Sequence, residues 1–167
     1  MPVKERPELD RWILSKLNNL VLTVREAMDA YDLTRGVRAI QDFTVEDLSN
    51  WYIRRARRRF WASTLDDDKR AVYNFAPFSA EELHLKLTEG EESVHLAAFP
   101  QADKEAIDKG VEERMDLARS LVGLGRAARE QVKVKVRQPL QKILVDGRHR
   151  ALLADLVPLI QEELNVK

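Results

Sequence analysis

The stretch Asp47-Leu-Ser-Asn-Trp-Tyr-Ile-Arg-Arg-Ala-Arg-Arg-Arg-Phe-Trp61 is the most informative part of this 167-residue chain. Five arginines fall within six of its positions, and a tryptophan stands on each side of them. The chain has a formal net charge of zero, so the total conceals this local cluster. Five neighbouring cations repel one another and require an external anion or a dense set of carboxylates. Because guanidinium groups bind phosphates bidentately and stack on bases, the stretch predicts an anion site, with RNA as the favoured anion.

On a helix, the spacing of the arginines relative to Trp51 places them around one region of the surface. Arg55 follows Trp51 by four residues and Arg58 by seven, so both extend the stripe of the tryptophan. Arg54 lies beside that stripe, and the other two arginines flank it. The candidate RNA-binding residues of this segment are Arg54, Arg55, Arg57, Arg58, Arg59 and Trp61, the last as a stacking partner for an unpaired base.

A second interpretation keeps the same arginines inside the protein. In this alternative the chain is a helical scaffold, and the arginines form ion pairs with Glu46, Asp47 or Glu81 or contact another domain. Burial distinguishes the two interpretations. Arginines held by the protein's own carboxylates favour the scaffold, and an exposed basic strip favours RNA.

The composition limits the class of protein. With 34% charged and 44% hydrophobic residues but only six glycines and six prolines, the chain suits a soluble helical protein. No apolar run approaches the roughly 20 residues that span a bilayer, and the N-terminus lacks the apolar region of a signal peptide. There is no cysteine, which excludes disulfides and thiolate zinc sites, and the three histidines are scattered without ligand spacing. We therefore expect no metal site.

Two helices carry the N-terminal part of the chain. Apolar residues recur every three or four positions between Pro7 and Tyr31, which predicts an amphipathic helix of about six turns. Asp32 or Thr34 is positioned to cap a second helix. Two long helices with a short connection lie antiparallel, so we expect a mainly α protein built as an antiparallel helical bundle. The second helix has two apolar stripes, Val37, Ile40, Leu48 and Trp51 in one and Ile53, Ala56 and Phe60 in the other.

The middle of the chain predicts shorter elements. The acidic run Asp66–Asp68 favours the start of a third helix, which is short because few residues follow before Pro77. Ser79, with a glutamate three residues later, forms a capping box for another helix. A connector then holds one short extended piece, Ser93–Leu96.

The C-terminal third predicts a small α/β extension. A long helix extends from Asp103 to about Gln131, and its glycines at 123 and 125 permit close helix packing. Strict alternation predicts a half-buried strand over Lys133–Arg137, and Ile143–Val145 is a second strand candidate. A last helix ends the chain and should kink at Pro158. We expect residues 1–100 to form the bundle and residues 101–167 this extension.

The predicted basic strand is a second candidate RNA contact. Lys133, Lys135 and Arg137 would project from one face of the strand about 7 Å apart, close to the spacing of successive phosphates. A solvated strand face is the alternative interpretation of the same pattern.

Six segments form a pattern in their order and spacing: Leu9-Asp10-Arg11-Trp12-Ile13-Leu14, Asp47–Phe60, Pro77–His84, Glu92–Leu96, Val136–Leu140 and Glu162–Lys167. Together they closely resemble the anticodon-binding domain of class I aminoacyl-tRNA synthetases. The resemblance covers nearly the whole chain, and its C-terminal segments are similar to the isoleucyl enzymes, although valyl and leucyl enzymes share the general plan.

This resemblance implies a function, and it also implies a catalytic domain that this sequence does not contain. It implies that the chain binds the anticodon arm of tRNA(Ile) and positions it for a catalytic domain of the same polypeptide, in a cytoplasmic enzyme that uses ATP. The HIGH and KMSKS signatures of that catalytic domain are absent from the sequence, as is any glycine-rich nucleotide loop. We therefore expect no catalytic residue, cofactor or metal in this chain itself.

The chain departs from the family pattern at one place. In the family an apolar-rich stretch separates the element Lys69–Asn74 from the proline–phenylalanine turn and completes the third helix, whereas here Phe75 follows Asn74 directly. Either the residues are deleted in this protein or the segment is missing from the sequence. A real deletion would remove much of one helix and expose the apolar stripes that pack on it.

Overall fold

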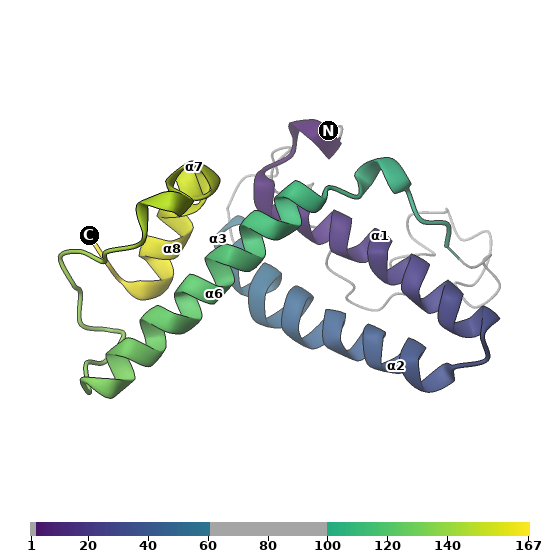
Figure 1. Ribbon diagram of the computed structural model, residues 1–167, viewed down its shortest axis with the longest axis horizontal. Helices are drawn as coiled ribbons and strands as arrows, with labels where there is room; N and C mark the ends of the chain where they lie inside the picture. The colour runs from purple at the N-terminus through teal and green to yellow at the C-terminus, as the bar shows by residue number, and fades with distance from the viewer. Residues whose placement is uncertain (1–2, 61–99) are drawn as a thin grey trace. The chain divides into compact units, whose positions relative to one another are not determined.

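The structure is a computed structural model that describes residues 3–60 and 100–167 (Figure 1). The backbone contacts divide the chain into two units, Met1–Asp108 and Lys109–Lys167. The described elements are helical, which confirms the prediction of a mainly α protein. The predicted third helix, the capping box at Ser79 and the extended piece Ser93–Leu96 lie outside the described residues.

The first unit is built on helix α1 (Glu8–Asp29). Pro7 stands just before the helix with φ −50° and ψ 149°, and its carbonyl accepts the backbone N–H groups of Asp10 and Arg11. This start confirms the expected position of the first helix. The fully buried side chains on α1 include Trp12 and Ile13, as its amphipathic pattern predicts.

A Schellman motif ends α1 and turns the chain toward α2 (Leu33–Asp42). The N–H of Asp32 bonds to the carbonyl of Ala27 at 2.8 Å, and the N–H of Tyr31 bonds to that of Met28 at 3.0 Å. Tyr31 occupies the left-handed position with φ 56°, where glycine is usual. The Asp32 carboxylate then accepts the N–H of Arg35 at 3.0 Å, so Asp32 is the cap.

Helix α2 continues without a break into a π-helical segment, η2 (Phe43–Ile53), and then into α3 (Arg54–Phe60). This rod packs antiparallel to α1, as Figure 1 shows. The prediction that Val37 and Trp51 belong to one apolar stripe is wrong. Val37 is 59% exposed, whereas Trp51 is 8% exposed, so the two side chains do not share a buried face. The wider π turns rotate the downstream residues relative to an α-helical register, so that Trp51 and Tyr52 are both buried.

Residues 100–108 return to α1 and pack against it. The helix expected from Asp103 is wrong in its first turn, which is a separate 3-10 turn, η3 (Lys104–Ala106), ended by extended backbone at Ile107. Asp103 caps this turn by accepting the N–H of Glu105. The N–H of Asp108 donates to Ser15 Oγ at 2.8 Å, and Arg11 pairs with the Asp108 carboxylate at 2.6 Å. These bonds to α1 stop the helix from starting earlier.

The second unit consists of one long helix and a broken one. Helix α6 (Lys109–Gln131) packs against α7 (Arg150–Leu153) and α8 (Val157–Leu164). The predicted kink at Pro158 is instead a break upstream of it, the 3-10 turn η5 (Ala154–Leu156), and the proline lies in the first turn of α8. Gly125 lies directly beneath Leu164, which confirms close packing there, whereas Gly123 faces open space.

Both predicted strands of the C-terminal part are wrong. Residues 132–139 form turns and irregular backbone after α6, and residues 143–145 have no regular secondary structure. Among residues 100–167 the structure shows a single isolated parallel bridge, between Leu140 and Val166. The segment after α6 folds as a loop because four of its carbonyls are bound by the side chains of Arg129 and Asn165.

Candidate nucleic-acid interface

The arginine helix α3 is anchored to α1 through one of its five arginines. The guanidinium of Arg59 donates to both oxygens of Asp10, at 2.6 and 2.7 Å. The Asp10 side chain is fully buried and that of Arg59 is 19% exposed. The parallel, bidentate geometry is the strongest form of an arginine–carboxylate pair. The carboxylate partner that the structure shows for Arg59 is thus Asp10, 49 residues upstream, an acid that the sequence analysis did not propose.

Tyr52 completes the buried cluster around Asp10. Its hydroxyl donates to Asp10 Oδ1 at 3.1 Å, and its side chain is fully buried. Burial raises the pKa of Tyr52 well above its ordinary value, and the neighbouring Asp10 carboxylate raises it further. The carboxylate therefore accepts three hydrogen bonds, which compensates for its removal from water.

Two other arginines of α3 face outward. Arg54 and Arg57 are exposed. Arg55 is half-buried, and its Cζ lies 5.2 Å from the ring centroid of Trp51, a cation–π contact. This contact confirms that Arg55 shares the stripe of Trp51. Arg58 belongs to α3, but its side chain and the whole of Trp61 lie outside the described residues.

The second basic element is a loop that begins at the end of α6. A Schellman motif closes that helix, with the N–H of Val134 bonded to the carbonyl of Arg129 and that of Lys133 bonded to Glu130. Lys133 occupies the left-handed position with φ 55°. Lys133, Lys135 and Arg137 are all exposed, so the three cations face solvent from turns and not from a strand.

Arg129 holds this loop from below. Its side chain is 4% exposed and donates four hydrogen bonds, all to backbone carbonyls. Two of the carbonyls belong to the loop, those of Lys135 at 3.1 Å and Gln138 at 2.9 Å. The other two belong to Leu164 and Asn165 at the C-terminal end of α8, where the helix dipole favours a cation.

Asn165 binds the two carbonyls that lie between those of Lys135 and Gln138. Its side-chain amide donates to Val136 at 3.1 Å and to Arg137 at 3.0 Å. Asn165 is the left-handed residue that ends α8, with φ 49°. Four consecutive carbonyls, from residue 135 to residue 138, are therefore bound by Arg129 or Asn165, and these side-chain bonds take the place of a β ladder.

Sequence reasoning missed Asp10, Arg129 and Asn165 as parts of these arrangements. A signal for each existed. Asp10 is an acid within the buried stripe of an amphipathic helix, where it requires a cationic partner. Asn165 follows the last apolar residue of a helix, where asparagine is typical of a left-handed cap. Arg129 lies in the last turn of α6, where a cation interacts favourably with the helix dipole, but this position did not indicate that the side chain binds the loop.

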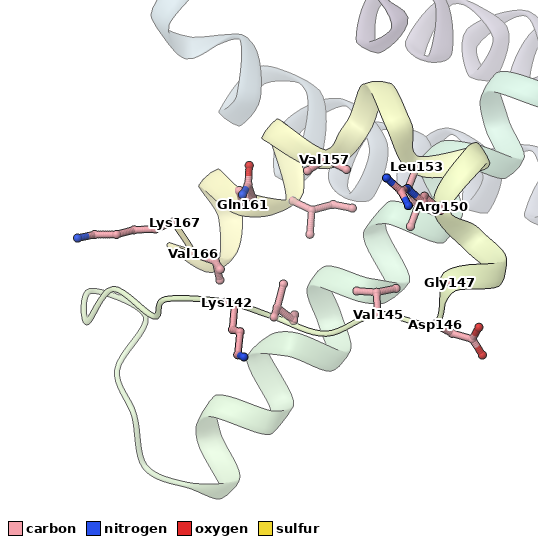
Figure 2. A pocket seen from close by; sticks show the side chains of 12 residues that line it. Lys142, Val145, Asp146, Gly147, Arg150, Leu153, Val157, Gln161, Val166 and Lys167 are labelled. Atoms are coloured by element: carbon pink, nitrogen blue, oxygen red, sulfur yellow. The ribbon is translucent and has the colours of Figure 1, made fainter.

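The second unit also contains a cavity of about 310 Å³ that residues 142–147 line on one side and residues of α8 on the other. Figure 2 shows Lys142 and Val145 on one side of it and Val157 and Gln161 on the other. The hydrogen bonds from Arg148 hold the pKa of Asp146, at the rim, below its ordinary value. Most of the lining is apolar, so the cavity does not resemble a phosphate site.

Within residues 3–60 and 100–167, no group of three or more His, Asp or Glu side chains could hold a metal ion. No helix in the same part of the chain is long and apolar enough to cross a membrane.

Comparison with known proteins identifies the class. The profile of the family described as the anticodon-binding domain of tRNA ligase matches residues 10–144. This chain therefore belongs to the anticodon-binding domain family of tRNA ligases. The matched region includes Asp10, all of the rod that carries the arginines, and the basic loop.

Similar proteins include several isoleucine–tRNA ligases. The chain is 40% identical over 185 residues to an isoleucine–tRNA ligase of Porphyromonas gingivalis, covering all of this chain and 16% of the relative. It is 45% identical over 186 residues to that of Dehalococcoides mccartyi and 44% identical over 183 residues to that of Chlamydia trachomatis, covering 98% of this chain and 18% of each relative. The chain thus spans about a sixth of the length of these ligases.

Proposed function

We propose that this chain is the tRNA-binding part of an isoleucine–tRNA ligase and binds the anticodon arm of tRNA(Ile). The observation that carries the proposal is the exposure of Arg54 and Arg57 on a helix that Arg59 fixes. The guanidinium of Arg59 is bound to Asp10, and Arg54 and Arg57 are exposed on the same helix. A helix held in this way presents cations at defined positions, which suits contacts to a phosphate backbone.

The mechanism is positioning. Arg54, Arg55 and Arg57 on α3 contact phosphates, and Lys133, Lys135 and Arg137 on the loop do the same in the second unit. The Cζ of Arg55 lies over the ring of Trp51, 5.2 Å from its centroid, and a guanidinium can also stack on a base. In the longer enzyme, the bound tRNA presents its acceptor end to a catalytic domain that uses ATP, in the cytoplasm.

The scaffold interpretation is favoured by a specific observation, the ion pair between Arg59 and Asp10. For this arginine the side chain is bound by the protein itself, so we assign it a structural part in the interface. Arg54 and Arg57 decide between the two functions. A scaffold needs them for contacts to another domain, and a tRNA-binding surface needs them for phosphates.

The test is a titration of the 167-residue chain with tRNA(Ile) over a range of salt concentrations. Arg54→Ala with Arg57→Ala should weaken binding and lower the slope of log affinity against log salt by about one unit per lost phosphate contact. Arg35→Ala is the matched control, because Arg35 is an exposed arginine on α2 paired with Glu26. An unchanged slope in the double variant would contradict the proposal.

A second arm of the titration tests specificity. The chain should bind tRNA(Ile) more tightly than a copy of the same tRNA with a changed anticodon, because base contacts add discrimination to the backbone attraction. Equal affinities would reduce the function to general backbone binding and would contradict anticodon recognition.

A further inference from the structure

We propose that Arg129 and Asn165 are positioning residues that hold the basic loop of residues 133–138 in a preformed, phosphate-binding conformation. This inference rests on the proposed tRNA-binding function and extends it to two residues that do not themselves contact the ligand. The inference is based on the hydrogen bonds that the side chains of Arg129 and Asn165 donate to the four consecutive carbonyls of residues 135–138.

The inward direction of the loop carbonyls leaves the outer surface of the loop to its cationic side chains. Arg129 binds the carbonyls of residues 135 and 138, and Asn165 binds those of 136 and 137, so the backbone of the loop turns its acceptors inward. Lys135 and Arg137 are exposed on the same stretch. An anion approaching the loop therefore meets cationic side chains and not carbonyl oxygens, which would repel a phosphate.

Arg129 also adds charge beneath the loop. Its four partners are neutral carbonyls, so its positive charge is not cancelled by a carboxylate among the described residues. A hollow of about 470 Å³ lies beside it and is lined by Arg126, Arg129, Lys133, Lys135 and one acid, Glu130. Arg126 is paired with Glu163. The remaining cations give the hollow a positive character that suits a phosphate of the tRNA backbone.

Preorganisation has a measurable consequence. A loop that is already ordered loses little conformational entropy when it binds, whereas a released loop must be ordered at that moment. Loss of the Asn165 bonds should therefore reduce affinity without removing any cation. The salt slope, which counts phosphate contacts, should stay the same.

Asn165→Gly is the variant that isolates this effect. Asn165 has φ 49°, a conformation that glycine adopts without strain, so the cap of α8 is retained while the two side-chain bonds are lost. Truncation of the buried Arg129 would leave four carbonyls without their donor and would risk unfolding the unit. Tyr31→Gly is the matched control, since Tyr31 occupies the equivalent left-handed position after α1.

The experiment is a titration of the 167-residue chain with tRNA(Ile), using four variants. Asn165→Gly should weaken binding about fivefold with an unchanged salt slope, and should speed hydrogen exchange of the amides of residues 136–138. Lys135→Ala with Arg137→Ala should weaken binding and lower the slope. Added to that double variant, Asn165→Gly should change affinity less than about twofold, because it acts through those side chains. Tyr31→Gly should bind as the unaltered chain does.

The other outcomes separate the two proposals. If Lys135→Ala with Arg137→Ala weakens binding but Asn165→Gly does not, positioning by Asn165 is wrong and the proposed function stands. If Asn165→Gly acts equally with and without the two cations, it acts through the fold, and the inference is overturned. If the loop cations have no effect while Arg54→Ala with Arg57→Ala does, the loop is not an RNA contact and the inference fails. If neither pair matters, the proposed function fails with it.

Discussion

Arg59 and Asp10 form a bidentate ion pair, with nitrogen–oxygen distances of 2.6 and 2.7 Å, that joins the arginine helix to the first helix of the chain. The pair turns one member of a cationic cluster into an anchor. The exposed arginines on the same short helix are thereby held at fixed positions relative to α1. In the proposed function, Arg59 contributes to the stability of the first unit, and Arg54 and Arg57 on the same helix contribute to tRNA binding.

Removal of Arg59 should be costly. Arg59→Ala leaves the Asp10 carboxylate fully buried with only the hydroxyl of Tyr52, and should lower the free energy of unfolding of the first unit by about 3 kcal/mol. Urea titration monitored by the fluorescence of the buried Trp12 and Trp51 measures the loss.

A second substitution provides the control. Asp10→Asn in the Arg59→Ala background removes the stranded charge, so the double variant should be more stable than the sum of the two single effects predicts. Strict additivity would show that the two side chains do not interact energetically.

Tyr52 should make the first unit sensitive to high pH. An unfolded tyrosine ionises near its ordinary pKa of 10.0, whereas in the folded protein burial and Asp10 keep Tyr52 protonated. Its contribution is complete below pH 10 and is lost as the pH rises above it, because the unfolded state then releases a proton that the folded state retains. The free energy of unfolding should fall by up to about 1.4 kcal/mol per pH unit relative to Tyr52→Phe.

The measurement compares the two proteins by urea unfolding between pH 9 and 11. Both proteins contain the same lysines and arginines, so the difference between the two pH profiles isolates Tyr52. Parallel profiles above pH 10 would contradict the raised pKa.

The sequence could predict the helices of the first unit because their signals are local. The period of apolar residues in α1 was confirmed, and of the two caps that the sequence offered, Asp32 and Thr34, the structure shows Asp32. The choice of which arginine turns inward is not local. Its partner, Asp10, is 49 residues away, and the π-helical segment between Phe43 and Ile53 changes the register that an α-helical count assumes.

The basic loop shows how a long-range contact overrides a local pattern. Alternation of lysine and valine favours a strand, yet the carbonyls of this stretch bond to Arg129 and to Asn165, which lies about thirty residues later in the chain. The identities of the candidate cations were predictable from the sequence. The backbone that presents them was not, because it depends on a residue at the end of another helix.

Replacement of Tyr31 by glycine should stabilise the first unit. Tyr31 holds φ 56° and is 93% exposed, so its side chain adds conformational strain with little burial. Glycine removes the strain, and the gain should be about 0.5–1 kcal/mol after the extra freedom of the unfolded chain is subtracted. Thermal unfolding measures the change, and Tyr31→Ala is the control that keeps the strain. Equal stability of the glycine and alanine variants would exclude relief of strain as the cause.

Gly125 should tolerate no larger residue while Leu164 remains. A Cβ atom at position 125 would lie 2.5 and 2.8 Å from the two Cδ atoms of Leu164, whose side chain is 1% exposed. Gly125→Ala should therefore push α8 away from α6 and lower the free energy of unfolding of the second unit by about 1–3 kcal/mol. This cost exceeds the gain in helix propensity of about 1 kcal/mol that alanine brings.

Two controls identify the clash as the cause. Gly123→Ala lies in the same helix with open space around it, so it should be neutral or stabilising. Leu164→Ala makes room for the new methyl group, and the substitution at 125 should then cost much less than it does beside leucine. Because Leu164 precedes the residue that holds the basic loop, Gly125→Ala should also speed hydrogen exchange in residues 136–138. A destabilised variant with unchanged exchange there would show that the packing of α8 and the order of the loop are independent.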